Sequence, residues 1–143
     1  MKEISCGTVP FTIKENRIYY LLIEGDPTGY VGFPKGHMED GETQKITARR
    51  ETLEETSITA KITGGFRKET HYRLSNGNEK TVVYFLCDFT GQVPAHCEGF
   101  EDFIYHVLPF DEAYEKLRFR SDKGILSAAN KFIKENILNK KDN

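Results

Sequence analysis

The sequence predicts an α/β domain that extends over the whole chain, residues 1–143. Length is the first observation, because a domain of this size buries roughly 70% of its unfolded surface and needs no disulfide or structural metal to form a core. The second is a series of segments rich in β-branched and aromatic residues, separated by turn residues, which predicts strands. The third is a set of stretches with helical caps or a helical spacing of apolar residues.

The N-terminal quarter predicts a pair of strands. Residues 3–13 and 17–24 are expected to be strands joined by a polar turn at 14–16. A loop at 25–29 then leads into the segment 30–36, which contains glycine, proline and aromatic residues.

One helix is predicted from Thr43 to Ser57, with Thr43 as its N-cap. Ile46 and Leu53 are seven positions apart and are expected to anchor this helix to a sheet.

The C-terminal half predicts further strands and ends in helices. The expected strands are residues 58–66, 67–74, 80–89 and 103–108. The Asn76-Gly77 pair indicates a hairpin turn, and residues 90–100 are expected to form a loop. The expected helices are residues 109–117 and 121–138, followed by a polar tail at 139–143 that is expected to fray. The last helix has a one-sided apolar stripe, which indicates packing.

The composition narrows the class of protein. The chain has 20 basic and 22 acidic side chains and a net charge of −2, which does not indicate a general nucleic-acid coat protein, so no stable nucleic-acid partner is expected. Cys6, Cys87 and Cys97 are an odd number without metal-type pairing and are expected to be reduced thiols. There is no signal-peptide pattern and no run of ~20 apolar residues. A cytoplasmic protein without a membrane partner is therefore expected.

Three carboxylates share one face of the predicted helix. Glu51, Glu54 and Glu55 stand at i, i+3 and i+4, within one turn. They repel one another and lie near the C-terminal end of the helix, where the dipole disfavours anions. The arrangement is favourable if hard divalent cations such as Mg²⁺ bind there, because these ions take oxygen ligands. A solvated acidic helix face is the alternative interpretation.

The loop before the helix favours a binding site. Gly32, Gly36 and Gly41 permit a tight backbone path close to a ligand. Glu42 precedes Arg50 by eight residues, so a loop that folds back over the helix would pair the two side chains. A bidentate pair of this kind holds the loop and the carboxylates in place better than a lysine would.

The segment 36–58 resembles the signature of the Nudix hydrolases. The matching positions are Gly36, Glu42, Arg50, Glu51, Glu54, Glu55 and Ile58. Thr52 departs from the pattern at an aliphatic position and Ser57 at a glycine, which puts in doubt only the backbone geometry at the helix end.

The resemblance implies an α/β/α sandwich with a mixed central sheet, and hydrolysis of a nucleoside diphosphate linked to another moiety. It also implies that Glu51, Glu54 and Glu55 hold Mg²⁺ or Mn²⁺, helped by a backbone carbonyl at Lys35 or Gly36. Catalytic roles are expected for Glu54, Glu55 and Arg50.

The flanking segments resemble the asymmetrical bis(5′-nucleosyl)-tetraphosphatases, the diadenosine tetraphosphate hydrolases, along nearly the whole chain. These segments are residues 33–37, 79–86, 101–105 and 108–113, with Phe119. Val107 departs from the branch, which usually has tryptophan there. The resemblance implies a small-molecule nucleotide substrate, diadenosine tetraphosphate, and the products ATP and AMP. It also implies a fourth, catalytic carboxylate from outside the signature, which completes the metal site or activates water; Glu101 aligns best with it and Glu98 is the neighbouring candidate.

Several side chains are candidates for contact with substrate. Lys80 and Tyr84 share one face of an extended strand, so Lys80 is expected to meet polyphosphate and Tyr84 the nucleotide. Tyr72 and Tyr105 are candidates for stacking on adenine, and His37 for contact with phosphate. Packing in the core or exposure to solvent is the alternative for each.

Two other functions remain open. Another Nudix enzyme would act on oxidised nucleoside triphosphates or on the 5′-triphosphate end of RNA, because the signature specifies the chemistry and the surrounding loops specify the substrate. A catalytically silent, nucleotide-sensing domain would lack at least one carboxylate of the signature, whereas all are present.

Overall fold

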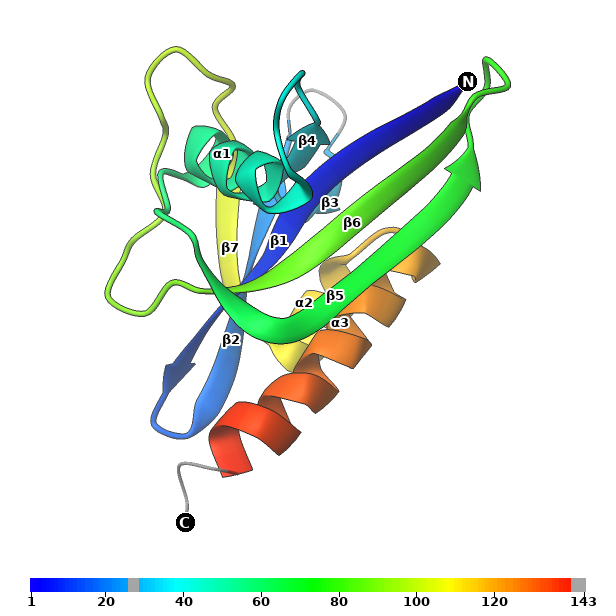
Figure 1. Ribbon diagram of the computed structural model, residues 1–143. Coiled ribbons are helices and arrows are strands. Elements are labelled where there is room, and N and C mark those ends of the chain that lie inside the picture. The colour runs from blue at the N-terminus through cyan, green and yellow to red at the C-terminus, as the bar shows by residue number, and fades with distance from the viewer. Residues whose placement is uncertain (26–28, 140–143) are drawn as a thin grey trace.

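The computed structural model describes residues 1–25 and 29–139 (Figure 1). Its strands are β1 (Lys2–Lys14), β2 (Arg17–Glu24), β3 (Val31–Gly32), β4 (Lys35–His37), β5 (Lys61–Arg73), β6 (Glu79–Asp88) and β7 (Ile104–Pro109). Its helices are α1 (Gln44–Thr56), α2 (Phe110–Lys116), α3 (Arg120–Ile133) and the π-helical segment η1 (Lys134–Leu138). The predicted loop at 25–29 and tail at 139–143 lie largely outside the described residues.

The strands form one mixed sheet. The order is β3-β2-β1-β6-β5, with β4 paired to β1 and β7 paired to β2. β1 and β6 are parallel and the other pairs are antiparallel. β1 is shared between two partners along one edge: Ser5 to Gly7 pair with β4, whereas Phe11 to Lys14 pair with β2. This branching places β4 beside the start of β1.

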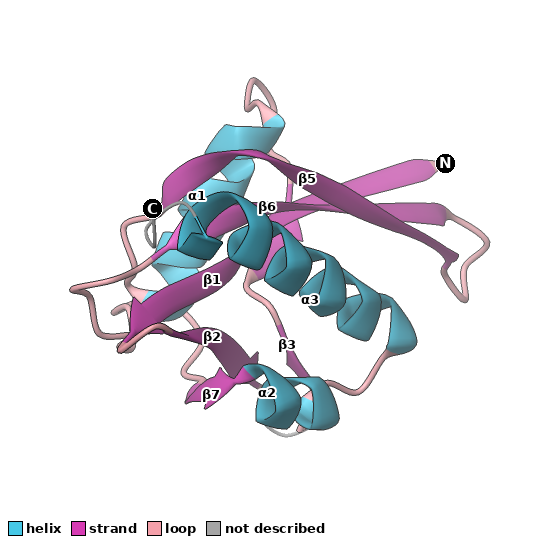
Figure 2. Cartoon of the chain, turned by 90° about the horizontal axis from the view of Figure 1, so that it is seen from below, coloured by secondary structure: helices cyan, strands magenta, loops and turns pink. Residues whose placement is uncertain are grey.

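Helices cover both faces of the sheet, as predicted for an α/β/α sandwich. α1 lies on one face, and α2 and α3 lie on the other (Figure 2). Successive strand residues point to opposite faces, so Val83 and Phe85 pack beside Ala48 of α1, whereas Val82 and Tyr84 pack in the cluster that contains α3 residues. The apolar stripe of α3 is buried as predicted, at Ile125, Leu126, Ala129 and Ile133.

The buried face of α1 differs from the prediction. Ile46 and Leu53 do not anchor the helix, because they are 46% and 45% exposed. The buried residues are Thr47, Ala48, Thr52 and Thr56. Threonine can be buried here because its hydroxyl bonds to the carbonyl of the preceding turn, at 2.8 Å from Thr52 to Ala48 and 2.6 Å from Thr56 to Thr52.

The Thr52 hydroxyl also joins α1 to the sheet. Its Oγ1 lies 2.7 Å from Oγ1 of Thr8 on β1, and both side chains are fully buried. Because Thr52 donates to the Ala48 carbonyl, it accepts from Thr8. A hydrogen bond therefore stands where the resembled signature has an aliphatic contact.

Thr52→Val is expected to lower the free energy of unfolding by about 1–3 kcal/mol, because it leaves the Thr8 hydroxyl buried without a partner. The double variant Thr8→Val/Thr52→Val should recover much of that loss, since both polar groups are then removed. Urea denaturation of the two single variants and the double variant measures the coupling. Losses that simply add would contradict this role for the pair.

Other elements differ in their bounds. The two strands predicted at 58–66 and 67–74 are one strand, β5, with an irregularity between Thr63 and Arg67. Gly65, at a φ of +92°, lies within that irregularity. The helix predicted at 121–138 ends as α3 at Ile133 and continues as η1. All three cysteines are free thiols, as predicted. Within the described part of the chain, no helix has both the length and the apolar character required to cross a membrane.

Candidate active site

The ends of α1 are fixed by local hydrogen bonds. Thr43 is the N-cap, as predicted, and its side chain accepts from the Ile46 backbone N–H at 3.2 Å. At the other end, Ser57 has a φ of 63° and its N–H donates to the Leu53 carbonyl at 2.9 Å. Serine thus adopts the left-handed conformation that glycine adopts more readily, so the departure at this position preserves the turn.

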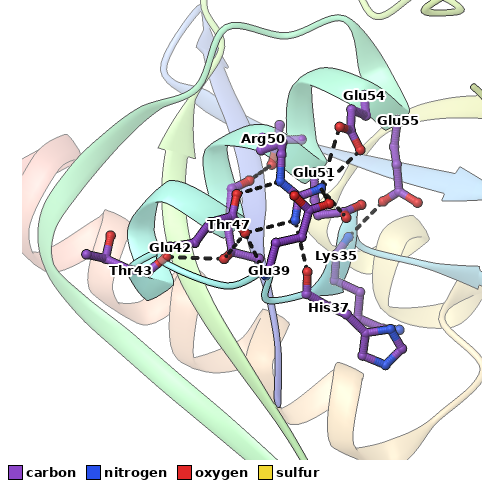
Figure 3. Close-up of polar contacts among 12 residues, drawn as sticks. Lys35, His37, Glu39, Glu42, Thr43, Thr47, Arg50, Glu51, Glu54 and Glu55 are labelled. Atoms are coloured by element: carbon purple, nitrogen blue, oxygen red, sulfur yellow. Dashed lines mark hydrogen bonds and ion pairs between the residues drawn. The ribbon is translucent and has the colours of Figure 1, made fainter. Parts of the chain in front are cut away.

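Arg50 holds the loop against the helix, as predicted. Its Nε lies 2.7 Å and its Nη2 3.0 Å from the two carboxylate oxygens of Glu42 (Figure 3). The same Nη2 donates to the His37 carbonyl at 2.9 Å. Hydrogen bonding by Arg50 lowers the pKa of Glu42 to about 2, so Glu42 stays charged and the loop stays braced at any ordinary pH.

Arg50 also orients two carboxylates of the predicted triad. Its Nη1 donates to Glu51 at 2.9 Å and to Glu54 at 3.2 Å. One guanidinium therefore contacts the loop and the acidic face of the helix, which a lysine ammonium at the end of a flexible chain would not reproduce.

Glu55 is the third carboxylate and is held from β4. Its Oε1 accepts from the Lys35 backbone N–H at 2.8 Å. Burial raises the pKa of Glu55 to about 8, and the charges of Glu51 and Glu101 add to the shift. Burial also raises the pKa of Glu51. Ionisation of both carboxyl groups therefore has a cost that a bound cation would offset.

Glu101 lies beside the predicted triad although it is distant in sequence. Its charge acts on Glu55, and its Oε2 lies 3.3 Å from the position that a Cβ on Gly25 would occupy. The other candidate for a fourth carboxylate, Glu98, is exposed in the loop between β6 and β7. The structure thus brings Glu101 towards the acidic cluster.

In the presence of a chelator, the free energy of unfolding is expected to fall as the pH rises from about 4.5 to about 8. The unfolded chain loses the Glu55 proton near 4.5, whereas the folded protein keeps it until about 8. When folding raises the pKa of a carboxyl group, the stabilisation is complete at a pH below the pKa in the unfolded chain. It is lost as the pH rises through the pKa in the folded protein. The Tm should fall by roughly 5 °C or more across this interval.

Glu55→Gln removes this ionisation and should flatten the dependence of Tm on pH. Glu112→Gln on α2, an exposed position, is the matched control and should keep the wild-type slope. Thermal melts of the wild-type protein and both variants, in a chelator at several pH values, measure these slopes. Parallel slopes for all three proteins would exclude Glu55 as the source.

β4 places neighbouring residues on opposite faces of the sheet. Gly36 faces α1, where a Cβ would lie 2.1 Å from Cδ of Glu51. A side chain at this position would therefore displace a predicted ligand. The preceding residue, Lys35, points the other way and lines a cavity on the face that α3 covers. Lys35 thus connects that cavity with the acidic cluster.

The cavity has a volume of about 460 Å³ and is largely aromatic. It is lined by Tyr30, Lys35, Thr70, His71, Tyr72, Val82, Tyr84, Phe119, Ser121 and Asp122. It brings together two predicted residues, Tyr72 and Tyr84. It also contains Tyr30 and Asp122, which the sequence did not single out because no local spacing relates positions so far apart.

The other predicted contact residues lie elsewhere. Lys80 is buried and its Nζ donates to Ser5 at 2.6 Å, and burial lowers its pKa. Lys80 lines a groove next to the cavity, with His71 and Tyr72 common to both. Tyr105 packs on the face that α1 covers, against Leu21 and its neighbours. The His37 side chain is 68% exposed and lies 3.5 Å from Glu3.

Comparison with known proteins gives matches over most of the chain. The family model of the NUDIX domain matches residues 6–128. The asymmetrical bis(5′-nucleosyl)-tetraphosphatase of Rattus norvegicus is 31% identical over 139 residues, which are 90% of this chain and 94% of that protein. A protein of the same name from Sus scrofa is 37% identical over 103 residues, which are 70% of this chain and 69% of its own length.

Solved structures share the fold. A crystal structure of a C. elegans Ap4A hydrolase in a binary complex matches with a TM-score of 0.84 at 22% identity, covering 93% of this chain and 98% of that one. The NUDIX domain of Shewanella oneidensis NrtR, cocrystallised with ADP ribose, matches with a TM-score of 0.73 at 16% identity, covering 93% and 89%. The predicted mixed sheet between two helical layers is thereby confirmed.

Proposed function

The chain belongs to the NUDIX domain family, and on that premise we propose that it hydrolyses dinucleoside polyphosphates and converts diadenosine tetraphosphate to ATP and AMP. As a member of this family, it is a hydrolase that acts on acid anhydrides. One observation carries the choice of substrate: an aromatic cavity is connected through Lys35 to a cluster of buried carboxylates. Such a cavity suits a nucleobase, because aromatic rings stack on every base.

The carboxylate cluster fits a divalent cation by its chemistry. Glu51 and Glu55 are largely buried and have raised pKa values, so a positive charge beside them would relieve the cost of their burial. Among the described residues, no three His, Cys, Asp or Glu side chains converge closely enough to hold an ion as they stand; Arg50 binds oxygens of Glu51 and Glu54 in this arrangement.

We propose that Glu51, Glu54 and Glu55 hold Mg²⁺ or Mn²⁺ together with a backbone carbonyl of Lys35 or Gly36. The bound ion would neutralise phosphate oxygens and make water a better nucleophile. The same side chains suit these ions because hard divalent cations prefer carboxylate and carbonyl oxygens.

The remaining steps rely on the chain's own groups. Arg50 fixes the directions of Glu51 and Glu54 through its Nη1. Glu55 has one oxygen on the Lys35 N–H, so its Oε2 is the atom that we propose accepts a proton from the attacking water. Glu101, whose charge acts on Glu55, keeps that acceptor basic. We propose that Lys35, which lines the cavity and adjoins the cluster, attracts the polyphosphate, and that Lys80, in the neighbouring groove, adds positive charge.

The site is one-sided, which supports asymmetric cleavage. One carboxylate cluster addresses one phosphorus, and the cavity fixes a nucleoside at a set distance from it. Attack therefore falls on the phosphate fourth from one adenosine, whereas two ADP would require attack at the centre of the chain.

Hydrolysis of diadenosine tetraphosphate in ¹⁸O-labelled water tests this proposal. We expect ATP and AMP as the products. Mass spectrometry should locate the label in AMP, because the attacked phosphate becomes the phosphate of AMP. Adenosine and guanosine triphosphates, an oxidised guanosine triphosphate and a 5′-triphosphorylated RNA serve as competing substrates. Two ADP as main products, or a marked preference for a triphosphate, would overturn the choice of substrate.

A further inference from the structure

We propose that Asp122 and Tyr84 form the floor of the cavity as a base-reading pair that selects adenine over guanine. The inference rests on the proposed function only in taking the cavity to hold a nucleobase. Asp122 would accept from the exocyclic amino group of adenine, and the Tyr84 hydroxyl would donate to the adjacent ring nitrogen.

Asp122 is a buried carboxylate that faces the cavity. It is 5% exposed, lies in the first turn of α3 and lines the cavity with Tyr84. Its Oδ2 accepts from the Tyr30 hydroxyl at 3.1 Å. A carboxylate accepts hydrogen bonds through both oxygens, so Oδ1 is the acceptor that this contact leaves for a ligand.

Tyr84 presents a buried donor at the same place. Its side chain is fully buried, and its hydroxyl has no hydrogen-bond partner within the described part of the chain. Burial raises the pKa of Asp122, and the nearby hydroxyls of Tyr30 and Tyr84 offset part of that rise, so the Tyr84 hydroxyl lies beside this carboxyl. Buried hydroxyls without partners are uncommon, and a ligand that enters the cavity would supply the missing acceptor.

The cavity has an exposed mouth and a buried floor. Tyr72 and Phe119 are 46% and 49% exposed, whereas Tyr84 and Asp122 are almost fully enclosed. A flat base stacked on the rings at the mouth would therefore direct one polar edge at the floor. Stacking itself is tolerant of sequence, because every base has a π-face; the floor is where bases can be told apart.

The floor offers one acceptor beside one donor. Adenine matches this pattern with an N6–H donor beside a ring-nitrogen acceptor. Guanine also presents an acceptor, O6, beside a donor, N1–H, but it carries the 2-amino group as a second, adjacent donor. It would therefore compete with Tyr30 for the second oxygen of Asp122 or leave its amino group without a partner. Unpaired polar groups of this kind give strong discrimination.

The test measures binding of free nucleotides, so that it does not depend on hydrolysis. Calorimetry is carried out with AMP, GMP and N6,N6-dimethyl-AMP, which lacks the N6–H donor. The wild-type protein is expected to bind AMP at least about tenfold more tightly than either of the others, the discrimination of a good paired contact to a base. Affinities for AMP and GMP within threefold of each other, or no detectable binding of either, would overturn the proposal.

Asp122→Asn should abolish the preference for AMP. The amide oxygen can keep the Tyr30 contact, and its NH₂ group then faces the cavity as a donor in place of the acceptor. Asp111→Asn is the matched control: the same change at an exposed position in the first turn of α2, where selectivity should not change. Equal weakening of all three nucleotides by Asp122→Asn would indicate a structural role alone and contradict the proposal.

Tyr84→Phe provides a second variant in case Asp122→Asn does not fold. It should weaken the binding of AMP by about fivefold or more, and an unchanged AMP affinity would exclude Tyr84 as a donor. The two proposals can fail separately. Selective AMP binding without hydrolysis of diadenosine tetraphosphate would remove the substrate and leave the base-reading pair. Hydrolysis of the diadenosine and diguanosine compounds at equal rates would remove the base-reading pair and leave the proposed substrate class.

Discussion

Glu54→Gln and Glu55→Gln are each expected to lower kcat by a factor on the order of 10³ while leaving the fold intact. Each change removes one negative charge from the cluster that we propose binds the metal, and Glu55→Gln also removes the proton acceptor. Glutamine keeps the size of the side chain and can still accept from the Lys35 N–H. The loss should therefore appear in turnover and metal affinity, with unchanged circular dichroism.

Kinetics at saturating Mg²⁺ and thermal melts measure the two properties separately. Glu112→Gln, exposed on α2, is the control for the same chemical change outside the site. A chelator should abolish the activity of the wild-type protein without unfolding it, because the core forms from the chain's own apolar residues. Near-wild-type turnover in both variants would refute the metal assignment.

Arg50→Lys is expected to reduce kcat/KM by roughly 10- to 100-fold although the charge is kept. The guanidinium makes paired contacts with Glu42, a contact with the His37 carbonyl, and contacts with two further carboxylates. A single ammonium cannot satisfy all of these directions. The loop and the acidic face would then lose their common support.

The neighbouring residue supplies the control for this variant. Arg49 is exposed on the same helix, so Arg49→Lys should leave kcat/KM unchanged. Glu42→Gln should resemble Arg50→Lys, because it weakens the same paired contact from the other side. Equal activity of Arg50→Lys and the wild-type protein would show that charge alone is sufficient.

The local part of the site was predictable from the sequence. Helix geometry fixes the Thr43 cap directly, and the Glu42–Arg50 pair requires only that the short loop before α1 folds back over the helix. The family resemblance supplied the sandwich fold and the alignment of Glu101. The functional roles of these residues remain predictions for the experiments described above.

The packing of α1 was predicted incorrectly for a physical reason. A helix was expected to bury its aliphatic residues, Ile46 and Leu53, but it buries threonines instead. Sequence patterns treat threonine as polar, whereas within a helix its hydroxyl is satisfied by the preceding turn and its methyl group remains available for packing. A period of four in Ala48, Thr52 and Thr56 was the signal that could have revealed this face.

The cavity could not be predicted because it depends on long-range pairing. Tyr30 and Asp122 are 92 positions apart and meet only after α3 packs on the sheet. The face that Tyr105 occupies has the same origin: the register of β7 with β2 places this side chain on the face that α1 covers. Strand order decides which face a side chain occupies, and single-sequence patterns do not specify strand order.

The alternation along β4 has a consequence for how this protein can evolve. Lys35 lies on the cavity side and Gly36 on the α1 side because side chains alternate with a period of two. Inserting or deleting one residue in this strand would exchange the two sides. It would direct a lysine at Glu51 and leave the cavity without its cation. We therefore expect the segment from Phe33 to His37 to keep its length, so that insertions in related sequences begin outside it.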